Sequence, residues 1–447
     1  MFAAPSQFLR VATACLGLLV ASAPAVVAQD PADARTTGLP AKLTWTFNFD
    51  ASWGTFGFGN SLFQDPREGV GVDLSDQWFE GAMKPTLSGA YKFASSSEIF
   101  GIVSAVGERT YGAAPVPAAP DMSSFQAEDL AIGWRSGADH EWEFTFGRAQ
   151  YRIGQGMLLW DGAAEGGSRG GYWTNARKAF ELAAVGRFKP SAQHTAEVFY
   201  LDKDDLPERD TGTRLWGGNY DYRPNDTSTF GASYLRFMAH PDVMPARDGL
   251  NVFNLRAYTA PFPAVPDLSF EGEYALERKG DEAQAIGWTA LGAYELSEVV
   301  WAPRLSYRYA FFQGDDPATA RNVTFDHLLP GFSDWSTWFQ GEIAGGYAFS
   351  NSNLISHQLR AHLTPSEAVS GGLILFKFLL DQPSTFAPGV TSADLAFEAD
   401  LYADWKINGN FTASFVLAFA NPDQAAEQAF DRRSNFRYGL AYVAYRY

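Results

Sequence analysis

Residues 43 to 53 read Leu-Thr-Trp-Thr-Phe-Asn-Phe-Asp-Ala-Ser-Trp, with an apolar or aromatic residue at every odd position and a polar residue at every even one. Successive side chains of a β-strand point to opposite faces. The stretch therefore predicts a strand that turns Trp45 and Phe47 to one side and Asn48 and Asp50 to the other. The fold depends on which solvent each face meets.

The same alternation recurs to the end of the chain. Leu305, Tyr307 and Tyr309, for example, alternate with Arg304, Ser306 and Arg308. Counting weaker cases, we expect eighteen strands. They are placed near 43–53, 79–93, 98–110, 125–135, 141–150, 179–188, 194–202, 213–223, 228–238, 250–259, 268–277, 284–296, 302–312, 354–364, 368–379, 395–407, 410–420 and 435–447.

The connections between these strands alternate in length. Long links such as 54–78 and 151–178 follow odd-numbered strands, whereas short ones such as 94–97 and 189–193 follow even-numbered strands. The exception is 278–283, which is short where a long link is due. Short turns at one end, long loops at the other and an even strand number are typical of a bacterial outer-membrane barrel.

Two local features agree with this architecture. Asn408-Gly409 is a preferred pair for a two-residue hairpin, because both residues tolerate positive φ. The chain ends on Tyr447, with Tyr445 and Val443 on the same face of the last strand. An aromatic last residue resembles the C-terminal signal read by the barrel-assembly machinery, which we therefore expect as a partner, together with membrane lipid and lipopolysaccharide.

The first 28 residues have the composition of a secretory signal peptide. Arg10 precedes an apolar stretch, and Ala25-Val-Val-Ala28 is a small-residue cleavage signature. We expect cleavage after Ala28, which leaves 29–447 as one barrel domain in the outer membrane of a Gram-negative cell. The only cysteine, Cys15, would be removed, which excludes a disulfide scaffold and a cysteine metal site.

Composition excludes other classes of protein. The 447-residue chain has a net charge of −17, so it is not a generic nucleic-acid binder. No later apolar run is long enough for a membrane-spanning helix. A soluble β-sandwich would have to bury eighteen aromatic-rich faces in one core, larger than single domains build. We therefore expect an all-β, antiparallel transmembrane barrel with short periplasmic turns and long extracellular loops.

Eighteen strands enclose more space than their side chains fill, so the polar faces should line water. Both signs of charge are expected there, and they would select solutes or merely pair across the wall. The basic set is Arg135, Arg187, Arg256, Arg304, Arg308 and Arg360. The acidic set is Asp50, Glu80, Glu143, Glu197, Glu271, Glu273, Glu277, Glu398, Asp400 and Asp404.

The link 151–178 and its flank are net positive in an acidic chain. The basic residues are Arg148, Arg152, Arg169, Arg177 and Lys178. Seven glycines would let the segment fold inward, and guanidinium groups suit carboxylate or phosphate. We predict an anion-selecting constriction; a solvated surface loop is the alternative. Because Arg148 shares the parity of Phe144 and Phe146, either a bulge intervenes or the residue lies above the lipid belt.

Other candidate sites have weaker support. The oxygen-rich run 201–210 offers calcium ligands, but its spacing fits no defined calcium loop, so solvation is the favoured interpretation. The six histidines form no recognisable motif, and neither Gly-x-Ser-x-Gly nor His-Glu-x-x-His occurs. We therefore expect no catalysis, no cofactor and no metal.

Three segments resemble the alginate-export family of outer-membrane porins. A strand-to-loop segment of that family is similar to residues 309–331, which read YAFFQGDDPATARNVTFDHLLPG. The stretch from Gly147-Arg148 to Asp161 resembles the family's Gly-Arg-Gln segment, which leads to an Arg-rich loop, and residues 397–420 resemble its penultimate hairpin. The resemblance implies an eighteen-stranded monomeric pore with an arginine-rich path for anionic saccharides, to which Arg148 and Arg152 would contribute.

The sequence departs from that family at informative places. His327 replaces a proline and Ala149 a glutamine. The family's exporter has a long periplasmic turn that plugs its pore, whereas Asn408-Gly409 makes the equivalent connection here. We therefore expect a passive channel for polar, anionic solutes or saccharides. An acidic-polysaccharide export channel is the alternative, and an outer-membrane hydrolase or adhesin represents other classes.

Overall fold

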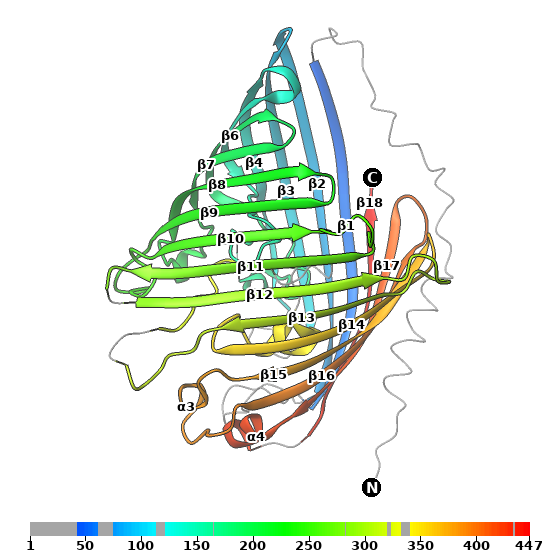
Figure 1. Cartoon of the computed structure of the whole chain (residues 1–447). Helices are drawn as coiled ribbons and strands as arrows, with labels where there is room; N and C mark the ends of the chain where they lie inside the picture. Colours follow the sequence, from blue (N-terminus) through cyan, green and yellow to red (C-terminus); the bar gives the residue numbers. More distant parts are fainter. Residues whose placement is uncertain are drawn as a thin grey trace.

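A computed structural model describes residues 43–60, 75–112, 121–163, 165–281, 283–319, 323–331, 340–431 and 434–447. The expected signal peptide lies outside the described residues. Eighteen strands form one sheet in which each strand pairs antiparallel with its neighbours in sequence. Because β1 also pairs with β18, the sheet closes into a barrel (Figure 1).

The first nine strands are β1 Leu43–Gly59, β2 Ser75–Ala94, β3 Ser97–Gly112, β4 Ser123–Ser136, β5 Trp142–Ala149, β6 Phe180–Ser191, β7 His194–Asp202, β8 Arg214–Asn225 and β9 Ser228–Met238. The second nine are β10 Asn251–Thr259, β11 Leu268–Lys279, β12 Ala283–Glu295, β13 Arg304–Phe312, β14 Leu354–Ser366, β15 Val369–Leu379, β16 Asp394–Lys406, β17 Phe411–Pro422 and β18 Phe436–Arg446.

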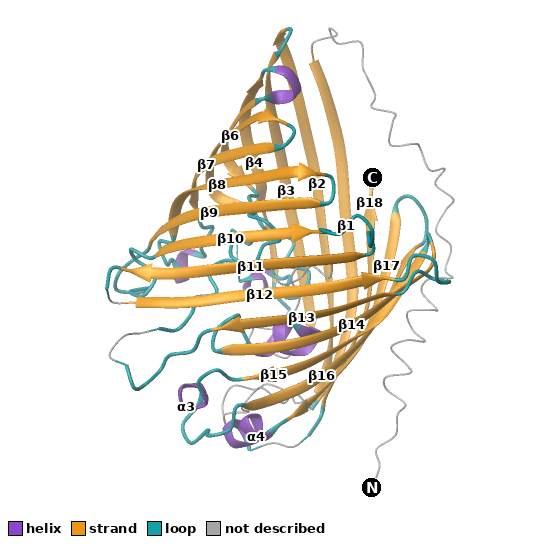
Figure 2. Ribbon diagram, viewed as in Figure 1, coloured by secondary structure: helices purple, strands orange, loops and turns teal. Residues whose placement is uncertain are grey.

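Helical elements are short and lie between strands (Figure 2). They are η1 Ala138–His140, α2 Gly166–Arg169, η2 Pro207–Arg209, the π-helix η3 Gly341–Ala348, α3 Pro383–Phe386 and α4 Gln424–Phe430. Within the described residues, no helix is long and apolar enough to cross a membrane.

The strand prediction is confirmed. All eighteen expected strands are present, and β7 and β9 have the expected bounds. The alternation of links also holds, since β2 and β3 are joined by 95–96 whereas β5 and β6 are joined by 150–179. The expected exception is present as well, because only 280–282 separate β11 from β12. The barrel therefore has a short-turn end and a long-loop end.

Aromatic side chains face outward, as the alternation predicts. Leu43, Phe47 and Trp53 on β1 are 38, 44 and 40 % exposed. Tyr447 is also exposed, and its amide and carbonyl bond to the backbone of Phe49, which completes the closure. A wall of this kind has no backbone edge and an apolar exterior, which together suit a bilayer rather than water.

The inner face is not polar throughout, which corrects one expectation. β1 runs six residues beyond the predicted end at Trp53, and the inward Phe56 and Phe58 on this extension are buried. Phe56 stacks on Trp78 of β2, with ring centroids 4.7 Å apart. Other inward side chains near the long-loop end are also apolar, among them Leu215, Phe237, Phe312, Phe376 and Phe378. This half of the interior is a hydrophobic core, because long links fold into it and pack there.

The Asn408-Gly409 hairpin differs from the expected one. Neither residue has positive φ, and the link spans 407–410. The Asn408 side-chain oxygen instead accepts hydrogen bonds from the amides of Asn410 and Phe411, at 2.9 and 3.0 Å. The asparagine thus closes an Asx-type turn through its side chain rather than through a left-handed backbone.

Replacing Phe56 by Ala should destabilise the barrel more than replacing Phe47 by Ala. The first substitution leaves a cavity in a packed core, at a cost of about 3–5 kcal/mol. At the second position acyl chains can fill the space, so the cavity term is absent. Urea unfolding in lipid vesicles would measure both free energies. An equal or larger loss for Phe47→Ala would contradict the assignment of the two faces.

Candidate functional site

The link between β5 and β6 folds into the barrel. Tyr151 donates a hydrogen bond to Glu197 on β7 at 3.0 Å, and Gln155 donates to Glu271 on β11 at 3.3 Å. Leu159 forms a β-bridge with Leu329 of the link that follows β13. Along the sheet, β7 lies two strands and β11 six strands from β5, where the link begins, so the link reaches around the inner wall and into the interior.

Carboxylates of the barrel wall hold the second half of this link. Glu80, Glu108 and Glu128 lie on the neighbouring strands β2, β3 and β4, and all three are buried. Each accepts hydrogen bonds from backbone amides of the link, which have no strand partner of their own. The donors are Trp173 and Thr174 to Glu80, Ala176 to Glu108, and Lys178 and Ala179 to Glu128, at 2.7–3.0 Å.

A second inward segment, η3, is held in the same way. Glu398 on β16 accepts the amides of Ile343 and Ala344, at 2.7 and 2.9 Å. Asp400, also on β16, accepts the amide of Glu342 at 3.1 Å. Both strand acids were expected to line a water-filled path. The structure corrects this expectation, because η3 covers them and leaves their side chains without exposure.

The two inward segments meet at an aromatic contact. Tyr172 and Tyr347 are stacked, with centroids 5.4 Å apart, and Trp173 donates its indole N–H to Glu342 at 2.7 Å. Burial, with the nearby Asp400 charge, raises the pKa of Glu342 to about 8. Glu342 is therefore mostly a neutral acid at pH 7, which suits its position between apolar rings.

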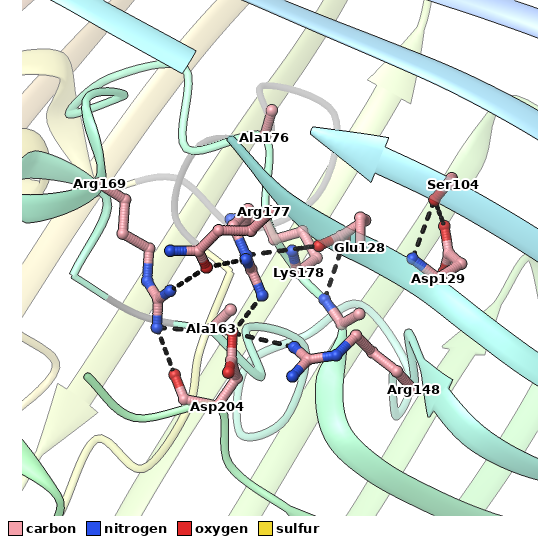
Figure 3. A network of polar contacts seen from close by, with 12 residues as sticks. Ser104, Glu128, Asp129, Arg148, Ala163, Arg169, Ala176, Arg177, Lys178 and Asp204 are labelled. Atoms are coloured by element: carbon pink, nitrogen blue, oxygen red, sulfur yellow. Dashed lines mark hydrogen bonds and ion pairs between the residues drawn. The ribbon is translucent and has the colours of Figure 1, made fainter. Parts of the chain in front are cut away.

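Three arginines expected at a constriction converge instead on Asp204 (Figure 3). Arg148 and Arg169 lie 3.1 and 3.5 Å from its carboxylate, and Arg177 donates a hydrogen bond to it. Arg169 and Arg177 are buried, and burial lowers the pKa of Arg177 while the Asp204 charge opposes that shift. Arg169 and Arg177 fasten the link to the segment after β7 and, being buried, do not face a passing solute. Arg148 reaches the same carboxylate from the end of β5.

A bulge explains the position of Arg148. Gly147 has φ +127°, and the register between β5 and β6 shifts between Gly147 and Ala149. The shift moves Arg148 from the parity of Phe146 to the inner side, where it reaches Asp204. Of the two explanations that the sequence left open, the structure selects the bulge.

Below the link, β6 to β13 line a cavity of 490 Å³. Its lining includes six basic and four acidic side chains, in a protein whose net charge is −17. The basic side chains are Arg152, Arg187, Lys189, Arg223, Arg256 and Arg308, and the acidic ones Glu197, Asp221, Glu271 and Glu273. Sequence reasoning missed Lys189 and Arg223, although each follows an inward residue by two positions.

Half of these cations are paired with acids. Arg187 lies 2.6 Å from both Glu143 and Glu197, Arg256 lies 3.0 Å from Asp221, and Arg308 lies 4.0 Å from Glu271. No ion pair within the described part of the chain involves the other three, Arg152, Lys189 and Arg223. The Arg152 guanidinium lies over the Trp160 ring at 4.6 Å. The unpaired cations give the cavity its positive character.

Basic residues continue along β13 and β14. Arg308 and Arg304 lie four residues apart on β13, and Arg360 on β14 is paired in register with Ser306 between them. Arg360 donates to the Tyr402 hydroxyl at 2.9 and 2.6 Å, so it is held by a neutral phenol. This part of the wall carries positive charge toward the short-turn end.

The remaining predicted residues have local partners. Arg135 pairs with Glu98 beside the short turn after β4, and Lys178 lies 3.1 Å from Asp161. Asp404 accepts a hydrogen bond from Ser414 at 2.6 Å. None of these contacts places the residue in the cavity lining.

A second cavity, of 460 Å³, lies against β1 to β4. Its charged lining residues are balanced, because Asp50 lies 2.7 Å from Arg446 and Asp129 lies 2.8 Å from Lys84. Of these two cavities, only the one lined by β6–β13 has an excess of basic side chains.

The acidic run 201–210 is used internally. Lys203 contacts Asp205, and Asp205 also accepts the amide and hydroxyl of Thr211, at 2.9 and 2.6 Å. Asp204 holds the arginines described above. Among the residues that the structure describes, no group of three or more His, Cys, Asp or Glu side chains has a metal-binding arrangement.

The sequence matches no protein-family model and no curated protein. Among similar solved structures are two of the outer membrane protein OpdK of Pseudomonas aeruginosa, one of them with vanillate. Their TM-scores are 0.55 and 0.53 at 12% sequence identity, and each match covers 90% of this chain and 98% of OpdK. OccK8 (OprE) of the same organism has a TM-score of 0.56 at 10% identity, covering 90% and 98%. OccAB4 of Acinetobacter baumannii has a TM-score of 0.55 at 9% identity, and the match covers 90% of this chain and 98% of OccAB4.

The fold is that of outer-membrane porins. At 9–12% identity, these similarities establish the architecture alone. The three proteins named above are Occ and Opd proteins, and none of them is an alginate exporter. The likeness to the alginate-export family thus stands at the level of the eighteen-stranded scaffold.

The docking of η3 should weaken as pH rises from about 4.5 to about 8. In this range docked Glu342 retains a proton that a released η3 would lose, so the docked state binds more protons and loses stability with rising pH. Hydrogen–deuterium exchange of residues 341–349, corrected for intrinsic rates, would detect the change. Glu342→Gln should reduce this pH dependence, whereas Glu298→Gln in an exposed turn should not. An unchanged dependence in Glu342→Gln would contradict the assignment.

Proposed function

We propose that the protein is an outer-membrane channel through which small polar anions diffuse. The observation that supports this function best is the cavity beneath the inward link, with six basic and four acidic lining side chains. Three of the cations lack an acidic partner in the described residues, so their field acts on a solute rather than on the wall. A low-dielectric wall around a basic path concentrates anions.

The path would continue from the cavity along β13 and β14. Arg308 and Arg304 are separated by about 13 Å along the strand. Arg360 lies between them on the neighbouring strand. Among the described residues, no acid forms an ion pair with Arg304 or Arg360. A carboxylate could therefore move from one guanidinium group to the next along this part of the wall.

The size of the cavity favours small solutes. The link 151–178 and η3 occupy the long-loop half of the interior, which narrows the route for a polymer. We propose small carboxylates or single sugar acids as the solute class. Vanillate, present with OpdK, is an anion of this size. The alginate-export resemblance suggests acidic saccharides, and export of a polymer is the less favoured form of the proposal.

We also propose the usual orientation of an outer-membrane barrel, with the long-loop end outside the cell and the short turns in the periplasm. The exposed Tyr447 at the end of β18 supports assembly through the C-terminal strand. Signal-peptide cleavage after Ala28 belongs to the same proposal. We propose no catalytic role.

Anion preference should depend on the three unpaired cations. In a water-filled path, a unit charge about 8 Å from an ion contributes about 0.5 kcal/mol without salt, and screening over one Debye length reduces this to about 0.2 kcal/mol. The contribution has opposite signs for an anion and a cation, so removing three cations should lower the anion-to-cation permeability ratio roughly sevenfold. Reversal potentials in planar bilayers under a KCl gradient would measure the ratio for wild type and for Arg152→Ala/Lys189→Ala/Arg223→Ala.

Arg109→Ala is the matched control, because Arg109 is exposed on the outer side of β3 beside Tyr111. This variant should keep the wild-type ratio. An absence of conductance in the wild type would contradict the channel. Cation preference in the wild type, unchanged by the triple substitution, would contradict the anion path.

A further inference from the structure

A row of basic side chains lies on the outer wall near the long-loop end. Arg236 on β9 and Arg278 on β11 are both paired in register with Asn251 on β10. Since neighbouring strands are about 4.8 Å apart, the two arginine positions are separated by about 10 Å. Both share the outward parity of Phe230 and Tyr274, which are exposed on their own strands.

Aromatic side chains lie beside and below this row. Trp216 is paired in register with Arg236 and is exposed, as is Phe253 on β10. Tyr234 packs between them, with centroids 5.7 Å from Trp216 and 5.3 Å from Phe253. Exposed aromatic girdles mark the membrane–water interface of outer-membrane barrels. The basic row therefore lies at the level of lipid headgroups.

Lys279, the last residue of β11, joins this patch because its side chain and that of Arg236 both lie close to Gly249. The three cations are weakly neutralised. Arg236 donates to the carbonyl of Gly249 at 2.5 Å, and Lys279 donates to the carbonyl of Pro245 at 2.7 Å. Neither forms an ion pair with any described residue. Arg278 lies 3.7 Å from Asp281, whose side chain is 95 % exposed. Three positive charges thus face one solvated carboxylate.

Nearby acids are engaged elsewhere. Asp248 accepts the amide of Ala239 at 3.2 Å, and Asp202 pairs with Arg214 at 3.1 Å. Arg236 and Lys279 both approach Gly249, whose φ is +82°. The tight backbone there lets the two side chains come together without an intervening side chain.

We propose that Arg236, Arg278 and Lys279 form a binding site for the phosphate groups of one lipopolysaccharide molecule, whose acyl chains lie against Trp216, Tyr234 and Phe253. Guanidinium groups bind phosphate through charge-assisted, often bidentate hydrogen bonds. An anionic headgroup complements this patch although the chain as a whole has a net charge of −17. The inference rests on the proposed function only for placing the long-loop end in the outer leaflet.

Native mass spectrometry of the detergent-solubilised full chain tests the site. The probes are diphosphorylated lipid A and the same lipid without phosphates. Wild type should bind the phosphorylated lipid at least roughly tenfold more tightly, because charge-assisted contacts are lost with the phosphates. Arg236→Ala/Lys279→Ala should remove that preference, and Arg109→Ala, on the outer wall at β3, should retain it.

If wild type binds the two lipids with equal affinity, this result alone overturns the proposal. An equal loss in Arg109→Ala would overturn the location. Heat-modifiable migration in gels verifies that each variant is folded. If the variant with alanine at position 236 misfolds, Arg236→Lys is used instead and should keep part of the wild-type preference for the phosphorylated lipid. The proposed channel function is tested separately, by reversal potentials in bilayers that contain no lipopolysaccharide, so the two proposals can fail independently.

Discussion

Every backbone amide and carbonyl that lies in a bilayer must find a partner within the protein, and this constraint organises the whole chain. On the wall the constraint is met by eighteen strands whose first and last members pair, ending with Tyr447 bonded to Phe49. Closure fixes an outer face for lipid and an inner face for everything else. The alternation in residues 43–53 is the sequence form of that division.

The same constraint acts on the segments inside the barrel, which have no ladder partners. Their amides are bonded to carboxylates of the wall, with Glu80, Glu108 and Glu128 on one side and Glu398 and Asp400 on another. An acidic wall residue that looks like a pore lining is therefore used to hold a loop. These acids lie on β2–β4 and β16 and are occupied by the inward segments, so they do not offset the basic excess of the cavity lined by β6–β13. The proposed anion path follows from this asymmetry.

The fold could be predicted from sequence because the relevant signal is local: a period of two, and links that alternate in length. The interior could not, because its contacts join distant segments. The sequence analysis ends the first strand at Trp53 and places Phe56 and Phe58 in the link 54–78, whereas β1 continues to Gly59 and both rings pack in the core. The basic charge and glycines of the link predict a constriction at Arg169 and Arg177, but their partner Asp204 follows another strand, so the sequence does not reveal that they are neutralised. Arg152 alone of that group reaches the cavity lining.

The central claim is that anions pass beside Arg152, at the cavity and not at the buried arginine cluster. Arg152→Cys tests it directly, since the only native cysteine, Cys15, lies in the expected signal peptide. A negatively charged thiol reagent should modify this variant in a planar bilayer, reduce its current and react faster than a positively charged reagent of similar size. Current unaffected by modification, or faster reaction of the positive reagent, would contradict the account.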